Sequence, residues 1–465
     1  MKKRHWLLVA VGCVLLLGAG VSAALFMSHR RDVTTTSEAA YQAYREGVAN
    51  ETRFYFKEAR LAYAKALELD PSFAMAMLGL ARQSKDDDQR LALLRRAAKE
   101  KDRLTERERL HVEMALALNE KRRDDAMKIA AEIHQKFPTD VRSAQMLAGH
   151  EFAFGRTDKG IKIFEELLTV DPNNADAYNQ MGYFYGYRGD YDKAVESFKR
   201  YQFIAPDTAN PFDSLGEVQA YSGHYNEALE NLNRALAIKP DFVESVGHIA
   251  VAREGMGEYR EAIKQYERAA EMTDHPDMQR MYITRAARAA YYLDDKDETR
   301  RLFSKAKAVK TESRYGEIDT DFIEAGLALC EGRPKDTIRM VQEIRPRLDA
   351  LVQRENIPKD WKPHFPAVNV LMALALEAEG KSDEALEYWK KNANPPNQFE
   401  NFEDRRAIYE ARAHVAVGLA RKGDLDGAEK LIAENRKWNA NWAPTRDEET
   451  TVAELRRDKV LAASK

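Results

Sequence analysis

The stretch from Met181 to Tyr201, MGYFYGYRGDYDKAVESFKRY, looks most like a chemical site, because it packs three glycines among tyrosines. A glycine-rich loop that cradles phosphate needs the pattern G-x-x-x-x-G-K-[S/T] after a strand. Gly182, Gly186 and Gly189 are instead spread over an expected helix and the turn that follows it. The nearest other match, in residues 149–157, has one residue too many and arginine in place of lysine. We therefore expect no nucleotide and no other cofactor.

Motifs for metal ions and for nucleophilic catalysis are equally scarce. His150-Glu151 lacks the second histidine of a zinc-binding H-E-x-x-H, and the ten histidines are dispersed. The two cysteines, Cys13 and Cys330, cannot form a cysteine-rich metal site. There is no G-x-S-x-G and no kinase triplet. We expect no catalytic residue and no metal ion. An enzyme remains an alternative that would use four residues of the C-terminal third: Trp361, His364, Trp389 and Trp438.

The composition excludes a global affinity for nucleic acid. The chain has 465 residues, a formal net charge of -3 and 32% charged residues. Phosphate backbones require a basic field or stripe. Basic residues do gather between Arg82 and Arg123, but acids are interleaved with them, which is typical of solvated helix faces.

The amino terminus is the strongest signal of location. An uncharged run from Trp6 to Met27 follows Lys2-Lys3-Arg4 and precedes Arg30-Arg31. As a helix, 22 residues would span about 33 Å, enough for a bilayer core. We expect a transmembrane anchor with the amino terminus in the cytoplasm and the bulk of the chain outside, in the periplasm of a bacterium. The alternative is a signal peptide cleaved after Val21-Ser22-Ala23, which would release the chain.

A repeat of 34 residues governs the middle of the chain. Pro138, Pro172, Pro206 and Pro240 follow one another at this interval. The same spacing links three further sets of residues: Gly155, Gly189, Gly223 and Gly257; Tyr191, Tyr225 and Tyr259; Ala194, Ala228 and Ala262. A fixed period of this length is the sequence signature of a solenoid built from stacked units.

The repeat resembles the tetratricopeptide repeat, a helix-turn-helix unit of 34 residues with the pattern W-x2-L-G-x2-Y…A-x3-F…P. The match is best in residues 141–276, and with the amino terminus it suggests a membrane-anchored bacterial type. The residues that carry it are Tyr178, Gly182, Tyr185, Ala194, Phe198, Pro206, Gly216, Ala228, Pro240 and Ala262.

The physics of these residues agrees with the resemblance. In residues 175–187, Tyr178, Met181, Gly182 and Tyr185 recur at offsets of three and four, so they share one helix face that must be buried. A glycine inside a helix costs about 1 kcal/mol relative to alanine. We therefore expect a neighbouring helix to pass close to Gly182. Thr105-x-x-Glu108 predicts a capping box at the start of another helix.

The resemblance implies an all-α, right-handed superhelical solenoid of about ten to eleven antiparallel helix pairs, preceded by the transmembrane helix. The expected organisation runs in chain order: 1–33, cytoplasmic stub and signal anchor or signal peptide; 34–276, solenoid; 277–346, degenerate helix pairs; 347–366, proline-rich irregular connection; 367–465, C-terminal pairs with a capping helix near 447–459.

The resemblance also implies an inner face, lined by the first helix of each pair, that holds a partner's peptide or helix. The expected groove residues are Asp176, Asn179, Gln180, Tyr183, Tyr187, Asn210, Asp213, Glu217, Tyr221, Glu244 and His248, followed by Glu254. This set is acidic and aromatic and includes no lysine or arginine, so we expect a ligand that carries one. The alternative is that these are ordinary solvated helix residues.

The sequence therefore predicts a non-enzymatic scaffold or adaptor that mediates protein-protein interaction at the cell envelope. The alternative, also based on the repeats, is a sensory or regulatory module that binds a peptide and passes a signal to a membrane partner.

Overall fold

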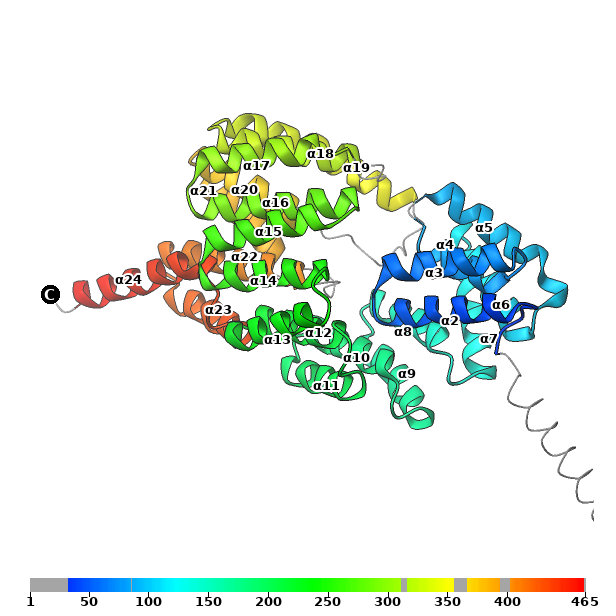
Figure 1. Cartoon of the computed structure of the whole chain (residues 1–465). Coiled ribbons are helices and arrows are strands. Elements are labelled where there is room, and N and C mark those ends of the chain that lie inside the picture. Colours follow the sequence, from blue (N-terminus) through cyan, green and yellow to red (C-terminus); the bar gives the residue numbers. More distant parts are fainter. Residues whose placement is uncertain (1–31, 85, 311–315, 355–365, 394–401, 464–465) are drawn as a thin grey trace, which may run out of the picture. The chain divides into compact units, whose positions relative to one another are not determined.

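The computed structural model describes residues 32–84, 86–310, 316–354, 366–393 and 402–463. These residues form 23 α-helices and two short 3-10 helices (Figure 1). The chain divides after Phe137 into two compact units, residues 1–137 and 138–465, and each unit is described by itself.

In the first unit, three helices pack around one buried tyrosine. Its helices are α2 (Glu38–Thr52), α3 (Phe56–Leu69), α4 (Ala74–Arg82), α5 (Asp87–Lys99), η1 (Lys101–Arg103), α6 (Glu106–Asn119) and α7 (Arg123–Lys136). Tyr63 on α3 is fully buried. A Cβ atom at Gly47 or Gly79 would come within 2.7 or 2.5 Å of its ring. Because both positions are glycine, α2 and α4 can close on α3.

The capping box expected at Thr105 is confirmed. The Thr105 hydroxyl accepts the backbone N–H of Glu108, and the Glu108 carboxylate accepts the backbone N–H of Thr105 at 2.9 Å. Glu108 is buried, and its second oxygen accepts the backbone N–H of Thr34 at 2.6 Å. One carboxylate thus starts α6 and fixes the segment before α2.

The second unit continues the succession of helices. They are α8 (Val141–Ala153), α9 (Thr157–Val170), α10 (Ala175–Arg188), α11 (Tyr191–Ile204), α12 (Asn210–Tyr221), α13 (Tyr225–Ile238), α14 (Val243–Met256), α15 (Tyr259–Met272), α16 (Pro276–Tyr292), α17 (Lys296–Ala308), α18 (Gly316–Cys330), α19 (Pro334–Arg354), α20 (Pro366–Ala378), α21 (Ser382–Ala393), α22 (Phe402–Arg421), α23 (Leu425–Trp438), η2 (Ala443–Thr445) and α24 (Arg446–Ala463).

Within each unit, successive helices pack as pairs, from α2 with α3 to α22 with α23. The described helices make eleven such pairs, and α24 then packs against α22 and α23. Short connections make the two helices of a pair antiparallel. This arrangement is an all-α solenoid, as the repeats predict.

The 34-residue spacing places one large side chain in the centre of each pair from α10 to α15. Phe198, Leu232 and Tyr266 are all fully buried. A Cβ atom at Gly182 would lie 2.6 Å from the Phe198 ring, and one at Gly216 would lie 2.6 Å from Leu232. The helix interior at these two points has room only for glycine.

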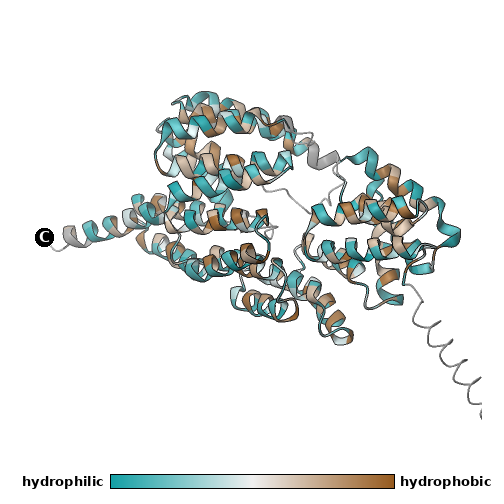
Figure 2. Cartoon of the chain, in the orientation of Figure 1, coloured by the Kyte–Doolittle hydropathy of each residue, from teal (hydrophilic) through white to brown (hydrophobic). Residues whose placement is uncertain are grey.

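The expected transmembrane helix requires a correction. No helix in the described ranges is both long and apolar enough to cross a bilayer. The longest of them, α19, α22 and α24, are rich in charged residues, and Figure 2 shows hydrophilic and hydrophobic residues mixed along individual helices. The run expected to span the membrane, Trp6 to Met27, lies outside the described residues. The transmembrane helix and the single-pass membrane location are therefore not retained.

The proline-rich stretch begins inside a helix. α19 passes through Pro346 and continues to Arg354, into the segment 347–366 that the sequence analysis expects to be irregular. Residues 355–365 lie outside the described part of the chain.

Candidate interaction surface

The eleven residues expected to line a groove lie on the first helices of three successive pairs, α10, α12 and α14. None of the eleven has an exposed side chain: four are buried and seven are half-buried. We call these residues, together with Glu254 on α14, the inner surface. Their role in binding a partner stays a prediction.

The acidic part of the inner surface is one connected network. Asp213 accepts a hydrogen bond from the Ser245 hydroxyl at 2.7 Å and contacts His248 Nδ1 at 3.0 Å. His248 Nε2 lies 3.4 Å from Glu217, whose carboxylate also accepts the Tyr183 hydroxyl at 3.0 Å. The imidazole is thus held between two carboxylates from α12.

Two amides extend this network along α10 and α12. The Ser214 hydroxyl donates to Asn179 at 3.2 Å, and Asn210 donates to the Tyr201 hydroxyl at 3.1 Å. Three of the expected residues are half-buried beside the network: Asp176, Gln180 and Glu244.

Burial and charge shift the protonation of these groups. Burial opposes a charge on His248, but Asp213 and Glu217 outweigh it and raise the pKa of the imidazole to about 9. Burial raises the pKa of Glu217 and of Glu244 above the usual range of a carboxyl group. At neutral pH the imidazole therefore carries a positive charge, which compensates for the acids around it.

The aromatic part of the inner surface is covered by the first residue of α22. Phe402 stacks on Tyr221, with ring centroids 4.9 Å apart and ring planes at 18°, and meets Tyr187 edge-on at 4.9 Å. Its side chain is buried. A Cβ atom at Gly186 would lie 2.7 Å from the Phe402 ring, so the glycine leaves room for it.

An arginine from the same helix reaches the buried carboxylate of α14. Arg406 Nη1 lies 3.0 Å from Glu254, which is 0% exposed. Arg288 on α16 contacts the same carboxylate at 3.1 Å, and the Tyr266 hydroxyl donates to it at 2.8 Å. Both cations come from helices outside the three that line the surface.

Two further contacts hold α22 in place beside the inner surface. The hydroxyls of Tyr191 and Tyr409 lie 3.0 Å apart, and the Tyr292 hydroxyl donates to Glu410 at 2.7 Å. Figure 1 shows α22–α24 (orange to red) beside α12–α14 (green). These contacts join segments that lie more than a hundred residues apart in the sequence.

The turns of the repeats contact residues at the end of α23 and directly after it. Gly189, Gly223 and Gly257 have φ of +93°, +84° and +83°, a conformation that favours glycine. A Cβ atom at Gly189 would overlap the Trp438 ring, one at Gly223 would lie 2.5 Å from Asn439, and one at Gly257 would lie 3.2 Å from Ala443. Three successive turns therefore contact three successive parts of residues 438–443.

The residues of the enzyme alternative do not come together in the described structure. Trp361 and His364 lie outside the described residues. Trp389 is buried and stacks on His414 at 4.0 Å, beside a cavity of about 420 Å³. Trp438 lies instead at the Gly189 turn. Among the described residues, no group of three or more His, Cys, Asp or Glu could hold a metal ion.

Sequence reasoning missed the residues that occupy the inner surface, Phe402 and Arg406, and also Arg288. One signal could have found the first two. Gly423 begins the turn of its unit, as Gly189 does, and lies 234 residues after it. The same shift applied to Ala175, the first residue of α10, gives Tyr409. α22 begins seven residues before that position. A helix that begins before the position expected from the 34-residue repeat therefore indicates an additional segment.

Comparison with known proteins supports the repeats. The family model of the tetratricopeptide repeat matches residues 174–241, which include α10 to α13. No curated protein sequence matches the chain.

Among solved structures, the crystal structure of the APC/C hetero-tetramer Cut9-Hcn1 is similar at 14% identity and a TM-score of 0.49, and the match covers 94% of this chain and 81% of that one. The crystal structure of MamA is similar at 22% identity and a TM-score of 0.30, with 34% of this chain and 92% of that one covered. The family match therefore identifies residues 174–241 as similar to tetratricopeptide repeats.

Proposed function

We propose that the chain is a non-enzymatic scaffold that binds a helix of a partner protein on its inner surface. Tetratricopeptide repeats are typical of protein-protein interaction. One observation carries the choice of the inner surface: α22 already lies there, with an aromatic ring and an arginine inserted between the first helices of successive repeats. The surface therefore has the shape and charge to hold a helix.

The chemistry of the surface defines the ligand. Its carboxylates Asp213, Glu217 and Glu254 favour a cationic side chain, and Tyr187 and Tyr221 favour an aromatic one. A partner helix that carries arginine matches both features, because guanidinium pairs with carboxylate in a fixed planar geometry.

A regulatory peptide-binding module is the second candidate. The seated α22 favours it, because a surface that is occupied within the chain can bind a partner only after release.

Photo-crosslinking tests the proposed function. A crosslinking amino acid replaces Gln180, which is half-buried at the inner surface, in the full chain, and a matched control replaces Phe203, which is 74% exposed on α11. We expect one discrete partner to be captured from position 180 and not from position 203, and Glu217→Lys to abolish the capture. Equal capture from both positions, or capture unchanged by Glu217→Lys, would contradict the proposal.

A further inference from the structure

The first two turns of α22, residues 402–408, extend beyond what their repeat requires. Aligned on the turn glycines, the regular part of the helix begins at Tyr409. That regular part packs within the C-terminal pairs: Ala411 and Val415 belong to one hydrophobic cluster there, and Ala416 and Ala420 to another. The regular part thus supplies contacts of α22 within the C-terminal pairs, and the extension lies beyond the start of the repeat.

The extension packs elsewhere. Phe402 belongs to the central hydrophobic cluster, whose other buried residues come from α11 to α18. The Phe402 ring is 2% exposed and contacts Tyr187 and Tyr221, and Arg406 is 7% exposed and contacts Glu254. The two side chains are four residues apart, so they lie on one face of the helix.

The contacts of this face combine apolar burial with charge. Phe402 fills the space left by Gly186, where a side chain would collide with it. Arg406 supplies one of two guanidinium groups on a carboxylate that is fully buried. A partner helix with the same two side chains at the same spacing would satisfy both sites.

We infer that residues 402–408 are a built-in occupant of the inner surface, and that a partner's helix displaces them by presenting an aromatic residue and an arginine four residues apart. This inference rests on the proposed function and names its ligand. The chain is closed while α22 is seated and open to a partner when the first two turns of α22 leave.

A peptide added in trans tests the inference. The probe is a fluorescein-labelled synthetic peptide of residues 401–414, NFEDRRAIYEARAH. It is added to the full wild-type chain and to the full chain with Phe402→Ala and Arg406→Ala. We expect the double variant to bind the peptide at least tenfold more tightly than wild type, measured by fluorescence anisotropy, because its inner surface is empty.

Two controls make this result specific. A peptide with alanine at both positions should not bind the double variant, and adding Glu254→Gln to the variant should weaken binding of the original peptide at least tenfold. The matched control chain carries Phe203→Ala and Arg436→Ala, which remove the same residue types from exposed positions. It should behave as wild type.

Equal affinity of the peptide for wild type and the folded double variant, or no binding to that variant, would overturn the inference. If circular dichroism shows that the alanine variant does not fold, Phe402→Leu with Arg406→Lys replaces it, since this pair retains volume and charge but loses ring stacking and the planar ion pair. The same comparison of affinities then decides.

The inference and the proposed function fail in different ways. If position 180 captures a partner equally in wild type and in the double variant, the scaffold stands and displacement of α22 is refuted. If the peptide binds the double variant but position 180 captures no partner, the occupant is established and the scaffold function is refuted.

Discussion

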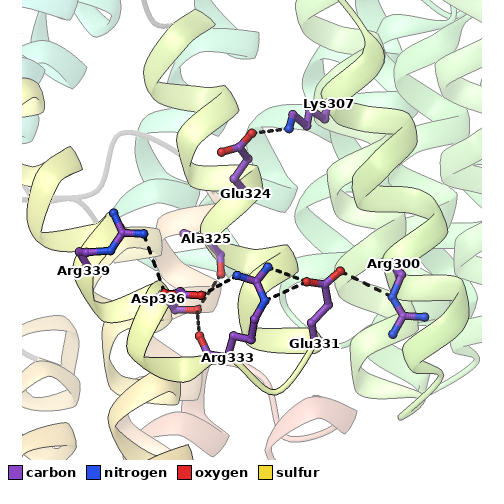
Figure 3. A network of polar contacts seen from close by, with 9 residues as sticks. Arg300, Lys307, Glu324, Ala325, Glu331, Arg333, Asp336 and Arg339 are labelled. Carbon is purple, nitrogen blue, oxygen red and sulfur yellow. Dashed lines mark hydrogen bonds and ion pairs between the residues drawn. The ribbon is translucent and has the colours of Figure 1, made fainter.

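Two networks of arginine and carboxylate groups in the second unit have the same chemistry in opposite settings. At the ends of α18 and α19, Arg333 contacts Glu331 and Asp336, each at 2.6 Å, with Arg333 48% exposed (Figure 3). At the inner surface, Arg406 contacts Glu254 at 3.0 Å, with side chains only 9% and 1% exposed. In the first network Arg333 contacts residues two and three positions away, whereas in the second Arg406 contacts a residue 152 positions away.

The difference teaches that the setting of an ion pair, not its residue types, decides its role. Exposed pairs contribute about 0 to 1 kcal/mol because water competes for both charges. Removing one partner of a buried pair costs about 3 to 5 kcal/mol because the other charge stays buried. The exposed pairs of Arg333 therefore lie within the turn between α18 and α19. The buried pair instead connects α22, a C-terminal helix, to α14 in the central repeats.

The largest effect is expected at the ring beside the buried network. Phe402→Ala should lower the free energy of unfolding of the second unit by about 3 to 5 kcal/mol, since a fully packed ring is replaced by a cavity. Phe203→Ala, the exposed control, should leave it nearly unchanged. Urea denaturation followed by circular dichroism measures both. Equal, small losses would mean that α22 is not docked on the inner surface in solution.

Removing the arginine should have the next largest effect. Arg406→Ala should cost about 3 kcal/mol, the lower part of the range for buried pairs, because Arg288 and Tyr266 remain on Glu254. The same denaturation experiment measures it. The double change Arg406→Ala with Glu254→Gln should cost less than the sum of the two single changes, because the residues contact each other. A double variant as unstable as the sum of the single changes would show that the two residues do not interact.

The pH dependence of stability tests whether the buried network around His248 also stabilises the fold. Because its folded pKa of about 9 lies above the unfolded value of about 6.5, the charged imidazole stabilises the fold fully below pH 6.5. This stabilisation is lost as the pH rises through 9, by up to about 3 kcal/mol. Thermal melts between pH 6 and 9.5 should show the loss, and His248→Gln should flatten it. An unchanged slope in that variant would assign the effect to other groups.

The smallest effect is expected in the exposed network of Figure 3. Arg333→Ala should change the free energy of unfolding by less than about 1 kcal/mol. Adding 1 M salt to wild type should have a similarly small effect at this site, since salt screens exposed pairs. A loss as large as that of Arg406→Ala, measured by the same urea titration, would break the contrast between the two networks.

Much of the solenoid is predictable from local pattern. The 34-residue period fixes where each pair begins and ends, because it places turn glycines, buried rings and terminal prolines at the same points of every unit. Gly182 and Gly216 lie beside the large residues of the next helix, Phe198 and Leu232, as helix spacing suggests. These are short-range relations, and a sequence displays them directly.

The occupant of the inner surface is not predictable in the same way. The pattern of α10, α12 and α14 shows which faces turn inward, but nothing in it points to Phe402 or Arg406. Their contacts with Glu254, Tyr221 and Tyr187 join residues 152 to 215 positions apart in the chain. The acids at Asp213 and Glu217 look solvated by composition alone. Their cation, His248, comes from the first helix of the next repeat, whereas one of the two arginines on Glu254 comes from the distant α22.

The three turn glycines that touch residues 438–443 limit how this solenoid can evolve. Repeat proteins commonly gain or lose whole units, because each unit contacts only its neighbours. Here Gly189, Gly223 and Gly257 are contacted in order by Trp438, Asn439 and Ala443. Inserting or deleting one unit between α10 and α15 would shift this series by a full step and undo its contacts. The number of repeats in this stretch is therefore constrained by the C-terminal segment that contacts one turn of each.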